Sequence, residues 1–516
     1  MKTGSILIFL FSASFLSIIG CQKPKKLSNP NILMVMCDQF RYDRLGVMGD
    51  PVIRTPNLDA LAREGIFFTN AYCPSPVCSP SRAALKTGLF PPANGVVTNW
   101  IPFRETIGGE TDIKNYLLPE RLKARGYFTG MAGKLHFVPP EDGYGFDFKA
   151  LHDAPYSIYA DDDRHSDYIQ WLTNTHFKES EKNVVGVFDL DESYYPDSIY
   201  KFIMGSGWRT EEQHDIPWTV SESIRFLELQ TGEKPFFLFT SLFGPHQPYV
   251  PPTPWDTLYN PDDIKLGPRF DATLDKSPIF QMNQGKLAGR LRTDWDLNRY
   301  REVIAAYYGQ ISMIDHYLGR LFDILKEKGL WDNTWILFLA DHGDFNGAYG
   351  TFFKGEMYDV SVKIPLIIKP AMGQWMQGIT EVPVNSIDVY GTILDIAGDT
   401  GWRELPLMES NSLLPLLHKG NLQNRTRKVY SIIGIEPSVN LCMLREGSLK
   451  IIRKAAKDRA AMYELYDLDP DPYETQNVYG HPAYREREQK LRDDIDSWWL
   501  KQSERYPEKL DHSFKK

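Results

Sequence analysis

Three apolar runs of this chain each lead into polar side chains that can carry chemistry. Continuous apolar runs of this length are typical of parallel β-strands that are covered on both faces. In open α/β sheets, ligands bind at the carboxyl ends of such strands. The runs are Ile32–Met36, Phe236–Phe239 and Trp335–Leu339. The sequence therefore predicts a sheet edge that carries the polar residues that come after them, namely Asp38, Gln39, His246, Asp341 and His342.

Helical patterns lie between these runs and after them. A helix is expected to start at Thr55-Pro56, and a long amphipathic stretch covers residues 301–328. Residues 386–397 have the pattern of another helix, which ends at Gly398. We therefore expect an α/β fold in which helices sandwich a large mixed, mostly parallel sheet.

The C-terminal part of the chain follows a different pattern. A chain of 516 residues is too long for one small core. After residue 420, short apolar runs have the spacing of a small antiparallel sheet, and a polar helix is expected near 485–500. The runs are Val429–Ile433, Leu441–Leu444 and Leu449–Ile452. We expect a large domain over residues 31–419 and a smaller α+β subdomain over 420–516.

The net charge of −9 argues against general nucleic-acid binding, so no nucleic-acid partner is expected. It does not exclude an anionic substrate, because a local basic pocket can form on an acidic protein.

The first 20 residues have the pattern of a signal peptide, with Lys2 followed by a short apolar stretch. Ile18-Ile19-Gly20-Cys21 resembles a bacterial lipobox, which implies cleavage before Cys21 and lipidation of that residue. Residues 21–30 would then be a tether. The expected location is the bacterial cell envelope, with the membrane contacted through the lipid anchor at the periplasmic or outer-membrane surface. The alternative is a plain secretory signal with a chance cysteine.

The run Cys78-Ser79-Pro80-Ser81-Arg82 predicts a helix start, and Gly88 can close the helix. Side chain 78 would then lie at a natural anion site, with the fixed charge of Arg82 one turn away. The run resembles the signature by which type I sulfatases, in the alkaline phosphatase superfamily, have a cysteine converted to formylglycine. The resemblance implies that Cys78 is modified, that residues 31–419 are the catalytic domain and that the fold is alkaline-phosphatase-like. The alternative is a small buried thiol in a turn.

Asp38, Gln39 and Asp341 offer oxygen ligands that suit Ca²⁺ or Mg²⁺, and the imidazole of His342 makes Mn²⁺ more plausible. Taken singly, these residues are also common turn residues. The resemblance implies a metal site that these four residues share with side chain 78, with Ca²⁺ as the first choice and Mn²⁺ or Mg²⁺ as alternatives. Gln39 departs from the commoner second aspartate. This departure resembles the branch that contains phosphonate monoester hydrolases and choline sulfatases.

Three further motifs resemble the basic lining of a sulfatase site. Gly133-Lys134-Leu135-His136 presents Lys134 and His136 after a short strand, and Pro245-His246-Gln247-Pro248-Tyr249 matches the family's PHxPY string. Lys354 matches a late lysine that touches the sulfate. The resemblance implies charge from the two lysines and a leaving-group proton from His246, and we assign His136 as the base. Without that context, each residue is more simply explained by packing or solvation.

The predicted function is therefore hydrolysis of a sulfate monoester, with a sulfated polysaccharide or glycosaminoglycan fragment as substrate by family inference. Aromatic residues between 150 and 215, such as Tyr156 and Trp208, could stack on sugar rings or could simply pack. The expected maturation partner is a formylglycine-generating enzyme or an anaerobic sulfatase-maturating enzyme. One alternative is a phosphonate monoester or phosphodiester hydrolase on the same scaffold. Another is a catalytically inactive, lipid-anchored carbohydrate-binding protein.

Overall fold

The computed structural model describes most of the chain after residue 28. The described residues are 29–99, 101–153, 166–176, 203–204, 210–271, 277–280, 295–373, 375–418, 427–434, 440–456 and 459–505. The predicted signal peptide, Cys21 and most of the tether lie outside this part, as do Tyr156 and Trp208. Among the described residues, no helix combines the length and apolar character that a membrane crossing requires.

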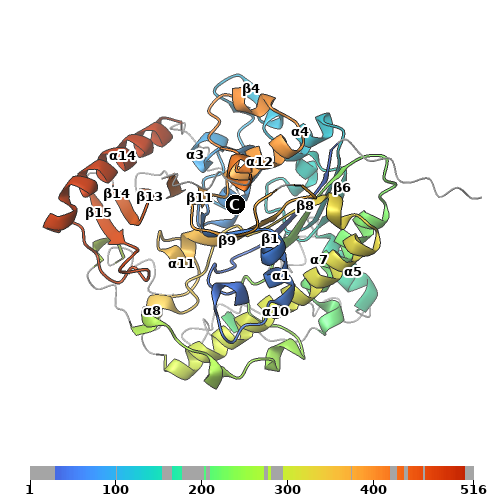
Figure 1. The fold of residues 1–516 in the computed structure, drawn as a ribbon, viewed down its shortest axis with the longest axis horizontal. Coiled ribbons are helices and arrows are strands. Elements are labelled where there is room, and N and C mark those ends of the chain that lie inside the picture. The colour runs from blue at the N-terminus through green and yellow to red at the C-terminus, as the bar shows by residue number, and fades with distance from the viewer. Residues whose placement is uncertain are drawn as a thin grey trace, which may run out of the picture.

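A nine-stranded mixed sheet forms the centre of the molecule (Figure 1), and its main path has the order β10-β2-β9-β8-β1-β7-β5-β6. Strand β1 is parallel to both β7 and β8, as predicted from the apolar runs. Among the described strands of this sheet, β9 alone runs antiparallel to its neighbours. The strands are β1 (Asn31–Cys37), β2 (Ile66–Tyr72), β5 (Phe128–Gly133), β6 (Phe148–Leu151), β7 (Phe236–Leu242), β8 (Thr334–Ala340), β9 (Lys363–Lys369), β10 (Gly378–Thr380) and β11 (Val384–Asn385), which pairs with β2.

Helices cover both faces of this sheet, and the sandwich predicted from the sequence is confirmed. Helices α1 (Pro56–Glu64), α7 (Asp215–Glu228) and α10 (Leu297–Glu327) pack on one face, and α2 (Cys78–Thr87), α4 (Leu118–Ala124) and α12 (Asp388–Ile396) lie on the other (Figure 1). The apolar stripe predicted for α10 is buried throughout: Ile304, Tyr308, Ile311, Ile314, Leu318 and Leu321. The shorter elements are α3 (Pro91–Asn94), α5 (Asp167–His176), α8 (Pro268–Asp271), α11 (Asp359–Val362), α13 (Leu414–Leu417), β3 (Thr106–Ile107) and β4 (Thr111–Asp112).

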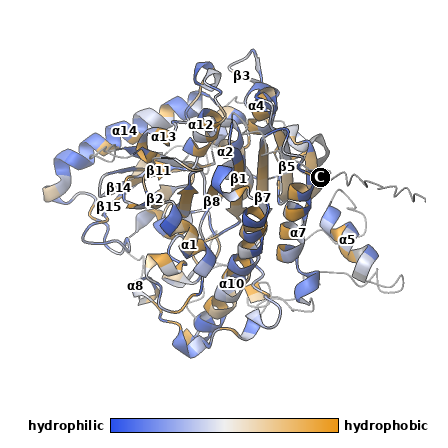
Figure 2. Ribbon diagram, turned by 45° about the vertical axis from the view of Figure 1, so that its right-hand side comes forward, coloured by the Kyte–Doolittle hydropathy of each residue, from blue (hydrophilic) through white to orange (hydrophobic). Residues whose placement is uncertain are grey.

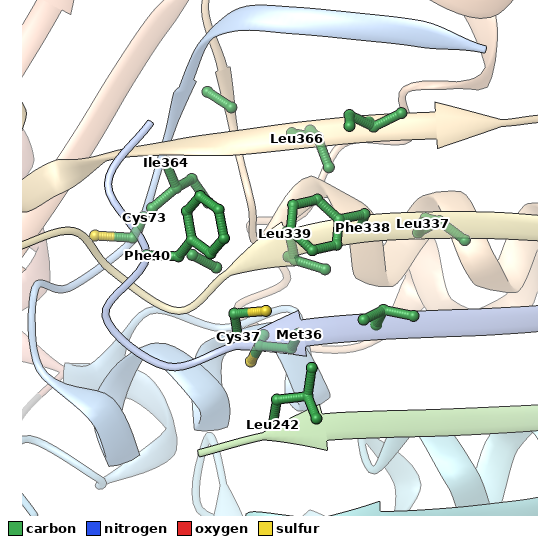
Figure 3. Packing of buried hydrophobic residues seen from close by; sticks show 14 of the residues in the cluster. Met36, Cys37, Phe40, Cys73, Leu242, Leu337, Phe338, Leu339, Ile364 and Leu366 are labelled. Carbon is green, nitrogen blue, oxygen red and sulfur yellow. The ribbon is translucent and has the colours of Figure 1, made fainter. Parts of the chain in front are cut away.

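The central strands are hydrophobic along their length, whereas the outer surfaces of the helices are polar (Figure 2). Every residue of β1, β7 and β8 is buried because helices cover both faces of these strands. Figure 3 shows Met36, Cys37, Leu242 and Leu339 packed where adjacent strands end, and the ring of Phe40 meets Phe338 edge-on at 5.7 Å. A buried apolar layer therefore supports the sheet edge from which the polar residues project.

The C-terminal part forms a second, antiparallel sheet of four strands. Three strands coincide with the predicted apolar runs, namely β12 (Lys428–Ile433), β13 (Asn440–Glu446) and β14 (Leu449–Ala456). The fourth, β15 (Arg459–Asp467), was not expected as a strand, because its alternating residues carry few aliphatic side chains. The predicted polar helix is α14 (Arg485–Glu504), which packs on β13 and β14 at the left of Figure 1.

A buried ion cluster joins this second sheet to the central one. The ammonium group of Lys450, on β14, lies 2.7 Å from Asp359 of α11 and 2.6 Å from Glu474. The carboxylate of Glu474 also accepts the main-chain N–H of Asp359 at 2.7 Å. Because Asp359 follows the predicted site residue Lys354 by one short turn, the cluster also anchors one wall of the candidate site.

Candidate active site

The polar residues that follow β1, β5, β7 and β8 come together at the carboxyl edge of the sheet, because these four strands are neighbours and parallel. The first residue of α2 and a loop after β8 complete the cluster. The ten predicted site residues meet at this edge: Asp38, Gln39, Cys78, Arg82, Lys134, His136, His246, Asp341, His342 and Lys354.

Cys78 is the first residue of α2 and is 1 % exposed. Its Sγ lies 3.2 Å from His342 Nε2, 3.2 Å from Lys354 Nζ and 3.7 Å from Asp38 Oδ1. Burial favours the neutral thiol, but the ammonium groups of Lys354 and Lys134 outweigh it, so the pKa of Cys78 is below its usual value. The site therefore stabilises negative charge on side chain 78.

Helix α2 begins and ends as the sequence predicts. Gly88 adopts φ 69°, the left-handed conformation that closes the helix. Lys86, near the end of this helix, is buried with its Nζ 3.9 Å from the ring centre of Phe239 and 4.8 Å from that of Phe146. Burial, together with the charge of Arg82, lowers the pKa of Lys86 well below its usual value, so the neutral amine is favoured here.

Arg82 forms hydrogen bonds to residues at the ends of four strands. Its guanidinium group is 1 % exposed and donates to Asp341 Oδ2 at 2.9 Å and to Asp38 Oδ2 at 3.1 Å. It also donates to the carbonyl of Lys134 and to the hydroxyl of Ser241, at the ends of β5 and β7. A single planar group therefore fixes four strand ends, which a lysine could not reproduce.

The acidic residues lie close enough together to hold a divalent cation. Ligand atoms of Asp38, Cys78, Asp341 and His342 all lie within 4.8 Å of one another and all four residues are buried. Two carboxylates, an imidazole and side chain 78 form a donor set that fits Ca²⁺, Mg²⁺ or Mn²⁺. Gln39 turns its amide oxygen towards the same cluster, where it accepts from Lys354 Nζ at 2.6 Å. The residues present therefore fit the predicted metal.

The charges of the cluster are strongly coupled. Burial alone would raise the pKa of Asp38, but Lys134, whose Nζ lies 2.7 Å away, and the other cations hold it well below the usual value. Burial lowers the pKa of His342, but Asp341 outweighs it and the pKa is raised. Burial and the neighbouring Lys134 lower the pKa of His136 well below its usual value. His136 is therefore neutral at pH 7, as a proton acceptor must be.

The turn that presents Lys134 and His136 is held by two residues to which sequence reasoning gave no role. The carboxylate of Asp153 accepts the main-chain N–H groups of Leu135 at 2.6 Å and His136 at 2.7 Å. The hydroxyl of Ser79 donates to the carbonyl of His136 at 2.9 Å. These bonds hold His136 at φ 62°. Ser79 belongs to the motif around Cys78, whereas no sequence signal marks Asp153.

Asp344 is a further residue that sequence reasoning left without a role. Its carboxylate accepts a hydrogen bond from the Gln39 amide and another, at 2.5 Å, from the hydroxyl of Tyr249. The run Asp341-His342-Gly343-Asp344 after β8 was the signal that could have revealed it.

Comparisons with known proteins agree with this geometry. The sulfatase family model matches residues 30–399, and a model of the C-terminal part of N-sulphoglucosamine sulphohydrolase matches residues 347–501. The chain is 31% identical to an arylsulfatase of Clostridium perfringens, over 90% of this chain and 93% of that one. It is 26% identical to the N-acetylglucosamine-6-O-sulfatase of Bacteroides thetaiotaomicron, over 95% of this chain and 90% of that one.

Among solved structures, the phosphonate monoester hydrolase of Silicibacter pomeroyi shares the fold, with a TM-score of 0.74 and 23% identity. The likeness covers 94% of this chain and 97% of that one, and the predicted alkaline-phosphatase-like architecture is confirmed. The match of the family model over most of the chain, together with the arylsulfatase relative, shows that the chain belongs to the sulfatase family and is a sulfuric ester hydrolase.

Proposed function

We propose that this sulfatase removes a sulfate monoester from a sulfated polysaccharide or glycosaminoglycan fragment, using formylglycine made from Cys78 and one divalent cation. The observation that carries the proposal is the position of Cys78 at the start of α2, in contact with Lys354, His342 and Asp38. The sugar substrate is supported by the similarity to the N-acetylglucosamine-6-O-sulfatase.

When present, formylglycine and the cation supply an oxygen nucleophile and a Lewis acid next to it. Asp38, Gln39, Asp341, His342 and side chain 78 would hold the cation. The residues of the chain do the rest. Lys134 and Lys354 place positive charge where the sulfuryl oxygens gather negative charge. Arg82 keeps the two carboxylates in position.

Histidine side chains handle the protons. His246 Nδ1 lies 2.7 Å from the carbonyl of Gln247 and donates to it, so the proton that is transferred to the leaving oxygen resides on Nε2. Burial and Lys354 lower the pKa of His246, and an anionic ester favours its protonated form. His136, which is neutral, takes the proton that must leave before sulfate is released.

The role of His246 predicts a dependence on the leaving group. In His246→Asn, kcat/KM for a sugar sulfate, whose alkoxide leaves poorly, is expected to fall by about 10²–10⁴-fold. The same change should lower kcat/KM for nitrophenyl sulfate much less, because nitrophenolate is a good leaving group that does not need to be protonated. Steady-state kinetics on the two esters measures the difference. Equal losses on both would contradict the assignment.

Removal of divalent cations is expected to reduce turnover to background, because the Lewis acid next to the nucleophile is then lost. Dialysis against EDTA followed by single additions of Ca²⁺, Mg²⁺ or Mn²⁺ tests this, with the fullest recovery expected from Ca²⁺. Full activity in the metal-free protein would count against the site.

Gln39 supports a second candidate, a phosphonate monoester or phosphodiester hydrolase on the same scaffold. Rates on an aryl sulfate and an aryl phosphonate monoester, measured side by side, separate the two. We expect the sulfate to be the better substrate.

Mass spectrometry of the peptide that spans residue 78 tests maturation by a formylglycine-generating or anaerobic sulfatase-maturating enzyme. Unmodified cysteine in protein from the native host would instead support the inactive carbohydrate-binding alternative. We further propose that the enzyme is anchored in the cell envelope through lipidated Cys21. Loss of membrane association in Cys21→Ala, measured by cell fractionation, is the expected result.

A further inference from the structure

The side-chain amide of Gln39 is buried between a cation and an anion. Its Oε1 accepts from Lys354 Nζ at 2.6 Å, and its Nε2 donates to Asp344 Oδ2 and, at 2.7 Å, to Gln247 Oε1. An ammonium group can only donate and a carboxylate can only accept, so these two partners decide which end of the amide is oxygen. The oxygen faces the side on which Lys354 contacts Cys78.

Asp344 itself cannot turn. It is fully buried, and its Oδ1 accepts the main-chain N–H groups of Asn346 at 2.7 Å and Phe353 at 3.1 Å. Its Oδ2 accepts from Tyr249 Oη at 2.5 Å as well as from Gln39. Each carboxylate oxygen therefore has two donors, and the group presents a fixed acceptor to the amide.

We propose that Asp344 is a positioning residue that locks the Gln39 amide with its oxygen towards the cation site. The inference rests on the proposed function, in which Gln39 is a neutral ligand of the cation. The two ends of an amide have nearly the same shape, and an amide turned the other way would point N–H groups at the cation. A carboxylate at position 39 would lie against the carboxylate of Asp344. Glutamine at 39 and aspartate at 344 therefore form a matched pair.

The variant Asp344→Asn tests the lock with almost no change of shape. Its new amide must keep its oxygen on the N–H groups of Asn346 and Phe353, so its NH₂ group faces Gln39. The Gln39 amide then meets a donor at each end, the new NH₂ group and the ammonium group of Lys354, so its oxygen is no longer held towards the cation. Isothermal titration calorimetry of the matured, metal-stripped protein with Ca²⁺ is expected to show a 10- to 100-fold weaker Kd, roughly the effect of losing a residue that orients a ligand. At limiting Ca²⁺, kcat/KM should fall with it and recover as Ca²⁺ is raised.

The exchanged pair Gln39→Glu with Asp344→Asn provides the rescue. The new carboxylate can accept from the new NH₂ with one oxygen and offer the other to the cation, and the net charge is that of the wild type. We expect the pair to bind Ca²⁺ at least about 10-fold more tightly than Asp344→Asn, a coupling typical of residues in direct contact. Gln39→Glu alone, with two adjacent carboxylates, should be the least stable of the three proteins.

Asp315→Asn is the matched control. Asp315 is also a buried aspartate that accepts from main-chain N–H groups, those of Asn57 and Leu58, but it belongs to α10 and its partners lie on α1. It should lower the melting temperature and leave the Kd for Ca²⁺ unchanged. The proposal is overturned if Asp344→Asn behaves in the same way, or if the exchanged pair binds no better than Asp344→Asn.

If Asp344→Asn does not fold, the exchanged pair alone provides the test. The lock is then overturned if the folded exchanged pair does not bind Ca²⁺. A wild type that neither binds Ca²⁺ nor hydrolyses a sulfate ester would instead overturn the proposed function, and the lock with it. If the wild type binds Ca²⁺ and hydrolyses a sulfate ester, and Asp344→Asn binds Ca²⁺ equally well, the role of Asp344 is overturned and the proposed function stands.

Discussion

Replacement of Cys78 by serine is expected to limit the enzyme to one turnover. A serine hydroxyl at the start of α2 can still attack the ester, but the sulfated serine that results has no second hydroxyl through which to expel sulfate. Multiple turnover should fall by roughly 10⁴-fold or more, as for the loss of a nucleophile in other covalent catalysts. Rapid-quench kinetics with an aryl sulfate should show a burst of no more than one phenol per protein molecule.

Cys78→Ala is the control, and it should show neither burst nor turnover. Both variants should fold, because side chain 78 is small and Arg82, not Cys78, joins the strand ends. Near-normal turnover by Cys78→Ser would eliminate the formylglycine mechanism.

Replacement of Lys450 by methionine is expected to be the most damaging change to stability outside the site. Lys450 is fully buried, and its removal takes away the ammonium group that contacts both Asp359 and Glu474, leaving Lys363, 3.8 Å from Asp359, as the nearest ion-pair partner of that carboxylate. Breaking a buried ion pair by removing one partner typically costs about 3–5 kcal/mol. Urea unfolding should show this loss, and Lys354, five residues before Asp359, should become less well fixed.

Lys490→Met is the matched control, because Lys490 pairs with Glu446 on the exposed surface of α14. Such a pair contributes about 1 kcal/mol at most. Equal effects of Lys450→Met and Lys490→Met would show that the buried cluster does not stabilise the fold. A triple change that also removes both carboxylates should regain part of the loss, because no buried carboxylate is then left without Lys450.

The architecture could be predicted because it follows from local patterns. The apolar runs before Asp38 and Asp341 become adjacent parallel strands, so their carboxyl ends meet for reasons of topology alone. The start of α2 at Cys78 and its end at Gly88 follow from proline and glycine chemistry. Most of the candidate site was therefore accessible from the chain itself.

The supporting residues were not accessible because their partners are distant in sequence. Asp344 holds Gln39 across 305 positions, and whether it faces Gln39 or solvent depends on how the loop after β8 folds back. Asp153 holds a turn by main-chain N–H groups, which any sequence provides. The burial of Lys86 could not be predicted either, because lysines are usually exposed and its neighbours Phe146 and Phe239 are distant in sequence.

The main-chain bonds of the site continue the central sheet. The N–H groups of Asp38, Lys134 and Asp341 donate to the carbonyls of Leu242, Ser241 and Cys37, which belong to the neighbouring strands. These amides can therefore exchange with deuterium only when the sheet itself comes apart, so the reaction centre should be among the slowest-exchanging parts of the molecule. Heat inactivation and global unfolding should then coincide, because the site residues lose their positions only when the central strands separate.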